Sequence, residues 1–251
     1  GDSLVINLGH HRAIVIDVGP DSTAADKCLR DLKIKEISLL ILSHFHADHV
    51  GGLSAVLHGR KVGQVWISNN LQPEIESRSA LDALNASQIA TVQKGLVTQI
   101  GQVNLKVLWP EASVRSFEEL PGEGSMINNS SIAVLLTTAD WSLFSAGDLE
   151  PPAQRELVNL VSPVDIYKVS HHGSKYQDEA LAKALSPQIG LISVGAKNPY
   201  GHPAPESIDS LTRLGTQVLR TDRDGAVAIT ASNHHLKVHR SKGRVKLFYW
   251  S

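Results

Sequence analysis

The hydrophobic positions of the chain fall into short runs that alternate between the spacing of strands and the spacing of helices. Residues 4–8 and 13–18 have the pattern of two strands joined by a tight turn. Residues 38–43 form a continuous apolar run, which is typical of a strand buried on both faces. Further strands are expected at 64–68, 102–109, 132–137, 142–145, 164–170, 190–194 and from 215 to the C-terminus. Helices are expected at 50–57, 73–92, from 151 onward, 178–185 and 205–214.

Because strands and helices are interspersed along the whole chain, the pattern predicts a layered α/β fold with two sheets, in a single domain covering residues 1–251. A chain of this length can bury a sizeable core without disulfides. Between residues 110 and 129 the composition turns to Glu, Ser, Gly and Pro. That stretch predicts an unusually long surface loop, of the kind that often serves as a lid or a binding loop.

Composition narrows the class of protein. Hydrophobic residues make up 42% and charged residues 20%, as in ordinary soluble domains. The net charge of −1 argues against a broad basic face that grips nucleic acid, but it leaves room for a small site that handles one phosphate. The single cysteine, Cys28, excludes a disulfide framework and a cysteine-based zinc site. No apolar run approaches the ~20 residues that span a bilayer. No targeting leader is visible, and because the chain starts at Gly1 we expect it to be part of a longer protein.

The apolar run at 38–43 leads directly into a dense group of potential metal ligands, which are His44, His46, Asp48 and His49. His44 and His46 are two positions apart, so in an extended backbone both rings can face one point. Asp48 and His49 can then face a second, neighbouring point. Neutral imidazole and carboxylate are the ligands expected for zinc, manganese or iron. The alternative is a loop of solvated histidines, but so many titratable groups beside an apolar strand need an ion to compensate them.

The pattern H-x-H-x-D-H followed by Gly51-Gly52 resembles the metallo-β-lactamase superfamily. Three further features match it. Asp17 ends a strand ahead of the histidine motif, Asp148 follows a strand in the sequence AGD, and His202 lies in the sequence NPYGHP. The resemblance implies an αββα sandwich, with two mixed sheets packed face to face and helices outside. It also implies a site for one or two metal ions at the sheet edges.

One element departs from the superfamily pattern. A further metal-binding histidine is expected between His49 and Asp148, but no histidine occurs between His58 and Asp148, and residues 128–131 read NNSS. The first metal position is therefore expected to lack its third imidazole. His171, in the sequence SHHGS, is the candidate that compensates for it.

The motifs NNxS, GD, HHGS and NxYGHP together resemble the soluble C-terminal domain of the ComEC family of competence proteins, which are membrane channels for DNA uptake. In that family the domain begins with a strand that closes in a GQGDS turn, so this chain, which starts at Gly1-Asp2-Ser3, is expected to begin inside that turn. The resemblance implies a parent protein in the cell membrane with this domain outside the cytoplasm. Its partners would be DNA and the transmembrane channel of the same parent, and the chain itself would bind no lipid.

The resemblance implies a metal-dependent phosphodiesterase that degrades one DNA strand during natural transformation. The first metal ion would be held by His44, His46 and His171. The second would be held by Asp48, His49 and His202. Asp148 would bridge the two ions, and Asp17 would orient a ligand from behind. Because an imidazole is replaced, manganese is favoured over zinc, although zinc could occupy the site.

The remaining candidates concern the substrate. The residues assigned to catalysis are Asp48, Asp148 and His172. His172 could act as the general acid or bind a phosphate oxygen, or it could be a structural histidine packed under the site. Asn128, Asn129 and Ser174 are candidates for contact with phosphate. The two asparagines could equally well form a turn into the following strand. Lys175 could contact phosphate or be solvated, and Tyr200 could stack on a base or simply pack.

Two other interpretations remain open at this point. The first is a metallo-hydrolase of a small ester, thioester or lactam, because a fold does not determine its substrate. The second is a non-catalytic module that holds DNA beside the channel, which the missing imidazole favours. The histidines outside the motifs are expected at the surface, and they are His10, His11, His58, His234, His235 and His239.

Overall fold

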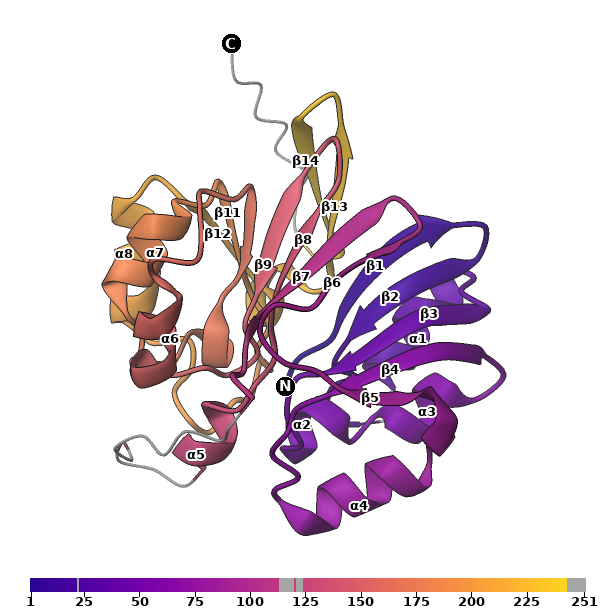
Figure 1. Ribbon diagram of the computed structural model, residues 1–251. Coiled ribbons are helices and arrows are strands. Elements are labelled where there is room, and N and C mark those ends of the chain that lie inside the picture. The colour runs from indigo at the N-terminus through magenta and orange to yellow at the C-terminus, as the bar shows by residue number, and fades with distance from the viewer. Residues whose placement is uncertain (22, 113–119, 121–123, 243–251) are drawn as a thin grey trace.

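Two β-sheets pack face to face at the centre of the molecule, and helices cover the outer face of each (Figure 1). The computed structural model describes residues 1–21, 23–112, 120 and 124–242. This arrangement of two sheets between outer helices confirms the αββα sandwich expected from the sequence. Among the helices of the described residues, none combines the length and the apolar character needed to cross a membrane.

The first sheet has the strand order β1 (Leu4–Gly9), β2 (Arg12–Ile16), β3 (Glu36–Leu42), β4 (Lys61–Ile67) and β5 (Ile89–Thr91). β1 and β2 form an antiparallel hairpin, whereas β2 to β5 run parallel. The helices that follow these strands pack on the outer face of the sheet. They are α1 (Ala24–Asp31), α2 (Ala47–Val50), α3 (Leu53–Leu57) and α4 (Glu74–Asp82).

The second sheet has the order β12 (Gln217–Arg220), β11 (Ile189–Ile192), β10 (Ile166–Lys168), β9 (Ser142–Ser145), β8 (Ala133–Thr137), β7 (Val103–Trp109) and β6 (Val97–Ile100). β9 to β12 run parallel, and β6 to β9 are antiparallel neighbours. Its outer face is covered by α6 (Pro151–Leu157), α7 (Glu179–Leu185) and α8 (Pro205–Arg213). A separate hairpin of β13 (Val227–Ser232) and β14 (His235–Arg240) stands beside the sandwich.

Burial of β3 explains why its sequence is apolar at every position from Leu39 to Leu42. Leu39 and Ile41 point into the layer shared with the second sheet. Leu40 and Leu42 point the other way, into the layer under the helices. All four side chains are fully buried, so the expected strand with two covered faces is confirmed.

Two helices expected from spacing differ in the structure. The helix expected at 50–57 is interrupted at Gly51-Gly52, which separates α2 from α3. A Cβ added at Gly51 would lie 2.3 Å from the carbonyl oxygen of Pro20, so the chain here passes too close to another backbone for any side chain. The helix expected at 73–92 ends at Asp82. Its second half becomes a 3-10 turn, η1 (Ala86–Gln88), and then β5, because pairing with β4 outweighs local helical spacing.

The loop expected at 110–129 is only partly described, since residues 113–119 and 121–123 lie outside the described residues. Its last part is not a surface loop. Ser125–Asn128 form a short helix, α5, and Asn128 and Asn129 are buried. β6 and the short helix α9 (Thr221–Asp224) were not expected from the sequence.

Candidate metal centre

The carboxyl ends of the parallel strands of both sheets meet at one end of the sandwich, where α/β proteins commonly bind ligands. Asp17 follows β2, and His44 follows β3. From the other sheet, Asp148 follows β9, and His172 lies in the 3-10 turn η2 (Ser170–Gly173) that follows β10. The N-terminus lies beside α2 in the same region (Figure 1), where the N–H of Asp2 donates to the carbonyl of Asp48 over 3.1 Å.

Two imidazoles and two carboxylates converge there. Nε2 of His172 lies 3.0 Å from Oδ2 of Asp48 and 3.2 Å from Oδ2 of Asp148. Nε2 of His49 lies 3.2 Å from the same Asp148 oxygen. Asp148 therefore faces both histidines with one oxygen, which is the arrangement of ligands around a common ion. We call Asp48, His49, Asp148 and His172 the carboxylate cluster.

Buried carboxylates hold both histidines of this cluster from behind. Nδ1 of His49 lies 2.9 Å from Oδ2 of Asp17, and Nδ1 of His172 lies 3.2 Å from Oδ1 of Asp2. Asp2 in turn accepts a 2.5 Å hydrogen bond from the buried ammonium of Lys168. Nδ1 of His172 also lies 3.0 Å from the carbonyl oxygen of Ser193. Carboxylate and carbonyl oxygens accept only, so each Nδ1 carries a proton, and each ring in its neutral form presents the Nε2 lone pair to the cluster. This tautomer is the one that binds a metal ion through Nε2.

His44 and His46 form a second, adjoining half of the site. Nε2 of His44 lies 3.1 Å from Nδ1 of His46, and ligand atoms of His44, His49 and Asp148 all lie within 4.8 Å of one another. His44 is supported by hydroxyl groups, whereas His49 and His172 are supported by carboxylates. Nδ1 of His44 lies 3.1 Å from Oγ of Ser43 and 3.2 Å from Oγ of Ser131. Ser131 belongs to the NNSS stretch, where the sequence lacks the expected histidine.

The two remaining histidines lie farther out. The ring of His171 is 5.5 Å from that of His202, centroid to centroid, and its Nδ1 is 3.5 Å from Oε1 of Glu150. Both His171 and His172 have left-handed backbone conformations, with φ of 47° and 53°, and this turn directs His172 to the carboxylates. His172 thus lies where the sequence analysis assigned His202. Metal ligation by His171 and His202 stays a prediction that the geometry does not support.

The residues predicted to contact phosphate are buried. Nδ2 of Asn128 donates to Oε1 of Glu150, and the N–H of Glu150 donates to Oδ1 of Asn129, each over 3.0 Å. Ser174 is fully buried, and its Oγ accepts the N–H of Tyr176 at 3.2 Å. Among the described residues, Oδ1 of Asn128 and Nδ2 of Asn129 are nevertheless buried polar atoms without a hydrogen-bond partner. Contact of these three residues with phosphate stays a prediction.

Sequence reasoning missed Asp2, Lys168 and Glu150 as residues of the site. Lys168 offered a signal, because a lysine in the strand expected at 164–170 needs a partner if that strand is buried. Asp2 was part of the quoted GDS turn, but no role followed from it. Glu150 had no local signal, since its partners lie in a distant segment.

The pKa values of the cluster reflect these contacts. Burial alone would lower the pKa of His49, but Asp148 and Asp17 outweigh it and raise that pKa to about 10. Burial also acts to lower the pKa of His172, and Asp148 and Asp2 raise it well above its usual value. The pKa of the Asp148 carboxyl is held well below its usual range by both imidazoles, against the effect of burial. In the metal-free chain, protons on the histidines thus supply the positive charge that the carboxylates require.

The cluster also contains buried polar atoms that lack hydrogen-bond partners, as expected where a metal ion binds. Among the described residues, the buried polar atoms without a hydrogen-bond partner include Nε2 of His49, Nε2 of His172 and Oδ1 of Asp148. Buried polar atoms are nearly always paired, so several that face one point indicate a ligand between them. Imidazole and carboxylate donors suit a divalent cation such as zinc or manganese. The residues present therefore fit a divalent metal site.

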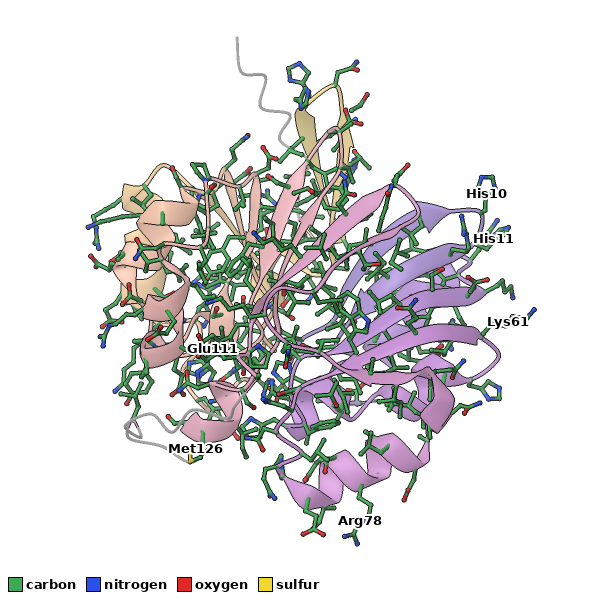
Figure 2. The ribbon with its side chains drawn as sticks, viewed as in Figure 1. His10, His11, Lys61, Arg78, Glu111 and Met126 are labelled. Atoms are coloured by element: carbon green, nitrogen blue, oxygen red, sulfur yellow. The ribbon has the colours of Figure 1, made fainter. Side chains whose placement is uncertain are left out.

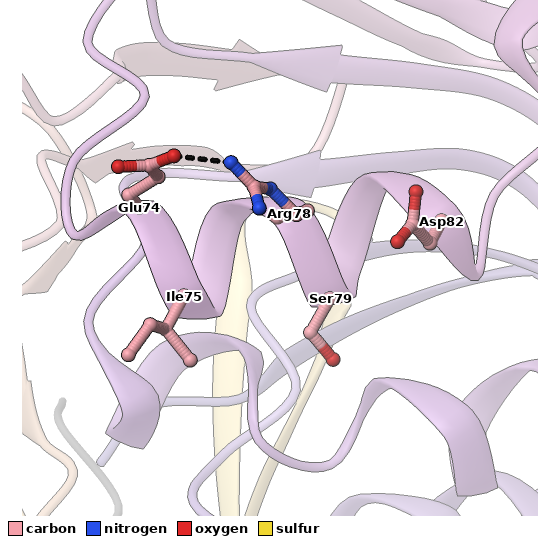
Figure 3. A pocket seen from close by; sticks show the side chains of 5 residues that line it. All are labelled: Glu74, Ile75, Arg78, Ser79 and Asp82. Atoms are coloured by element: carbon pink, nitrogen blue, oxygen red, sulfur yellow. Dashed lines mark hydrogen bonds and ion pairs between the residues drawn. The ribbon is translucent and has the colours of Figure 1, made fainter.

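Two other regions carry no such chemistry. A hollow of about 600 Å³ on the outside of α4 is lined by the side chains labelled in Figure 3, which are Glu74, Ile75, Arg78, Ser79 and Asp82. None of these is a predicted site residue. His10 and His11 are exposed at the tip of the β1–β2 hairpin (Figure 2), at the end of β2 opposite to Asp17, as expected from the sequence.

Comparison with known proteins agrees with the fold. ComE operon protein 3 of Bacillus subtilis is 30% identical to the chain over 257 residues, which cover 93% of the chain and 32% of that protein. Competence protein ComA of Neisseria gonorrhoeae is 26% identical over 256 residues, covering 96% of the chain and 32% of that protein. The chain thus spans about a third of the length of these curated relatives. The Zn²⁺-bound PqqB of Methylobacterium extorquens has the same fold, with a TM-score of 0.55 at 10% identity over 87% of this chain and 85% of that one. The sequence pattern of the metallo-beta-lactamase superfamily matches residues 1–195, and the chain therefore belongs to that superfamily.

Proposed function

We propose that the chain is a metal-dependent hydrolase of DNA phosphodiesters that acts during DNA uptake. The observation that carries the proposal is the position of Asp148. Its Oδ2 lies 3.2 Å from Nε2 of both His49 and His172, and its carboxylate is also within 4.8 Å of a ring nitrogen of His44. A carboxylate placed between two groups of imidazoles is suited to hold two cations close together.

The carboxylate cluster would hold one ion, and His44 and His46 together with Asp148 would hold the other. Two divalent cations so placed would supply an activated water and neutralise the charge that develops on a phosphodiester. We favour manganese, with zinc as an ion that can also occupy the site, because the NNSS stretch supplies no third imidazole, which would make the site softer.

The chain's own residues prepare this chemistry. Asp17 keeps the Nδ1 proton of His49 in place, and the carbonyl of Ser193 together with Asp2 keeps that of His172, so both Nε2 atoms stay aimed at the cluster. With Nε2 of His172 held against Asp48 and Asp148, we assign His172 to metal binding instead of proton donation. Asp48 is 41% exposed at its side chain and therefore lies on the side of the cluster that a substrate can approach.

The name of one relative, competence protein ComA of Neisseria gonorrhoeae, supports DNA as the substrate, since competence is the uptake of DNA and that protein matches 96% of this chain. We extend the proposal to the parent protein. It would lie in the cell membrane, with this domain outside the cytoplasm, and its transmembrane channel would be the partner that delivers one strand of the DNA to the site.

A cleavage assay tests the proposal. Chelator-treated protein is mixed with labelled single-stranded and double-stranded DNA, with and without Mn²⁺. Asp148→Ala is run beside Asp82→Ala, whose side chain lies on the surface of α4. Cleavage that requires the metal, survives Asp82→Ala and is lost in Asp148→Ala supports the proposal, and cleavage by Asp148→Ala at the full rate refutes the role of Asp148.

One observation favours a second candidate, a module that holds DNA without cutting it. His44 is supported by two hydroxyl groups and the NNSS stretch supplies no imidazole, so this half of the site is the weaker one. DNA binding with a bound metal ion and without cleavage would favour this candidate. Failure to bind DNA at all would instead point to a small ester, thioester or lactam.

A further inference from the structure

Tyr200 stands out because its aromatic ring is largely exposed to solvent. Its side chain is 80% exposed, although it lies in the segment between β11 and α8 that borders the metal centre. The N–H of Tyr200 donates to Oδ1 of Asn198 over 2.7 Å, which holds the backbone in a local turn. A large, solvent-exposed aromatic ring beside a site is typical of a surface that binds a planar ligand group by stacking.

The ring of Tyr200 continues a row of rings that starts at the carboxylates. It stacks on His202 at 24° between ring planes, with centroids 6.1 Å apart. His202 stacks in turn toward His172 at 29°, with centroids 6.5 Å apart. Nε2 of His172 lies 3.0 Å from Asp48, so the row leads from the metal centre to solvent. Lys197, which is exposed three residues before Tyr200, adds one positive charge to the same segment.

We propose that Tyr200 and His202 form a platform on which an unpaired base stacks while the adjoining phosphodiester lies at the metal centre. Every base has a π-face, so an aromatic ring binds single strands with little regard to sequence. A base inside a duplex is already stacked on both faces and cannot take this position. The inference rests on the proposed function and narrows its substrate to single-stranded nucleic acid or a strand that has been separated.

Binding through this platform does not require a broad basic face, which agrees with the net charge of −1. Affinity would come from stacking and from the few charges next to the site.

Binding is measured by fluorescence anisotropy with two labelled 15-mers, an oligothymidylate and an oligomer of the same length made of abasic units. Tyr200→Ala should weaken binding of the oligothymidylate by between about 5-fold and 150-fold. Binding of the abasic strand should stay unchanged. Tyr200→Phe should keep the affinity, because the ring remains. Ile75→Ala, which removes an 81% exposed side chain from α4, is the control for loss of exposed apolar surface.

The platform is overturned if Tyr200→Ala lowers the affinity for the two strands equally, or lowers the affinity for neither. Cleavage is followed in the same samples after addition of Mn²⁺. If the wild-type chain discriminates between the two strands in binding but cleaves neither, the platform stands and the proposed hydrolase activity fails. If it cleaves and Tyr200→Ala does not change the discrimination, the activity stands and the platform fails.

Discussion

Replacing Asp17 by asparagine should weaken metal binding at the carboxylate cluster without disturbing the backbone. Asp17 is buried and accepts three contacts, from the N–H of Ser43 at 2.7 Å, from its hydroxyl at 2.8 Å and from Nδ1 of His49 at 2.9 Å. Its φ of 56° is left-handed, a conformation that asparagine tolerates better than most residues. In the Asp17→Asn variant, the amide oxygen of the new side chain can keep the bond from the Ser43 N–H.

The substitution acts through the tautomer of His49. The amide nitrogen of the new side chain donates, so it opposes the Nδ1 proton that Asp17 accepts. His49 then shifts its proton to Nε2, which points at the carboxylates where the ion would be held. Loss of such a supporting carboxylate weakens metal affinity about 10- to 100-fold, or by about 1.4 to 2.7 kcal/mol.

The affinity for Zn²⁺ and Mn²⁺ is measured by competition with a chromophoric chelator, and thermal unfolding of the metal-free chain shows that the variant folds. Asp26→Asn is the matched control, because Asp26 is also buried and charge-paired, with Arg60 at 2.8 Å, but it lies on α1 away from the cluster. An unchanged affinity in Asp17→Asn, or an equal loss in Asp26→Asn, would refute the reasoning.

Five further outcomes are expected. Asp148→Ala should abolish metal-dependent cleavage while the circular dichroism spectrum stays native. A loss of less than about 100-fold in turnover would contradict the assigned role. Metal binding displaces the proton of His49, whose pKa is raised to about 10, so affinity measured by titration calorimetry should rise with pH up to that value, and a flat profile would contradict this. In the metal-free chain the same raised pKa stabilises the fold fully below about pH 6.5, and this contribution should be lost as pH rises through about 10 in urea unfolding curves. Gly51→Ala should lower the free energy of unfolding by about 1–3 kcal/mol because its Cβ would lie 2.3 Å from the Pro20 oxygen, whereas His10→Ala should leave both stability and turnover unchanged.

Local sequence determined the elements whose residues interact with their near neighbours. The apolar run that became β3 was evident because both faces of that strand are covered, and the adjoining H-x-H-x-D-H motif placed His44, His46, Asp48 and His49 at its end. The order of strands and helices was sufficient to predict a layered α/β fold with two sheets, and the motif's resemblance to a known superfamily added the αββα arrangement. The break at Gly51 was not evident, since it depends on a close approach to the loop that carries Pro20.

Only the tertiary structure decided how the rest of the site is assembled. Asp2 supports His172 and pairs with Lys168, although 166 residues separate Asp2 from Lys168 along the chain. The left-handed turn at His171 and His172 determines which of the two rings reaches the carboxylates. Nδ2 of Asn128 donates to Oε1 of Glu150, a contact that forms because folding buries both side chains together. Periodicity and spacing describe the environment of a residue within its own element, whereas these contacts arise only when separate elements pack together and require each buried polar group to find a partner.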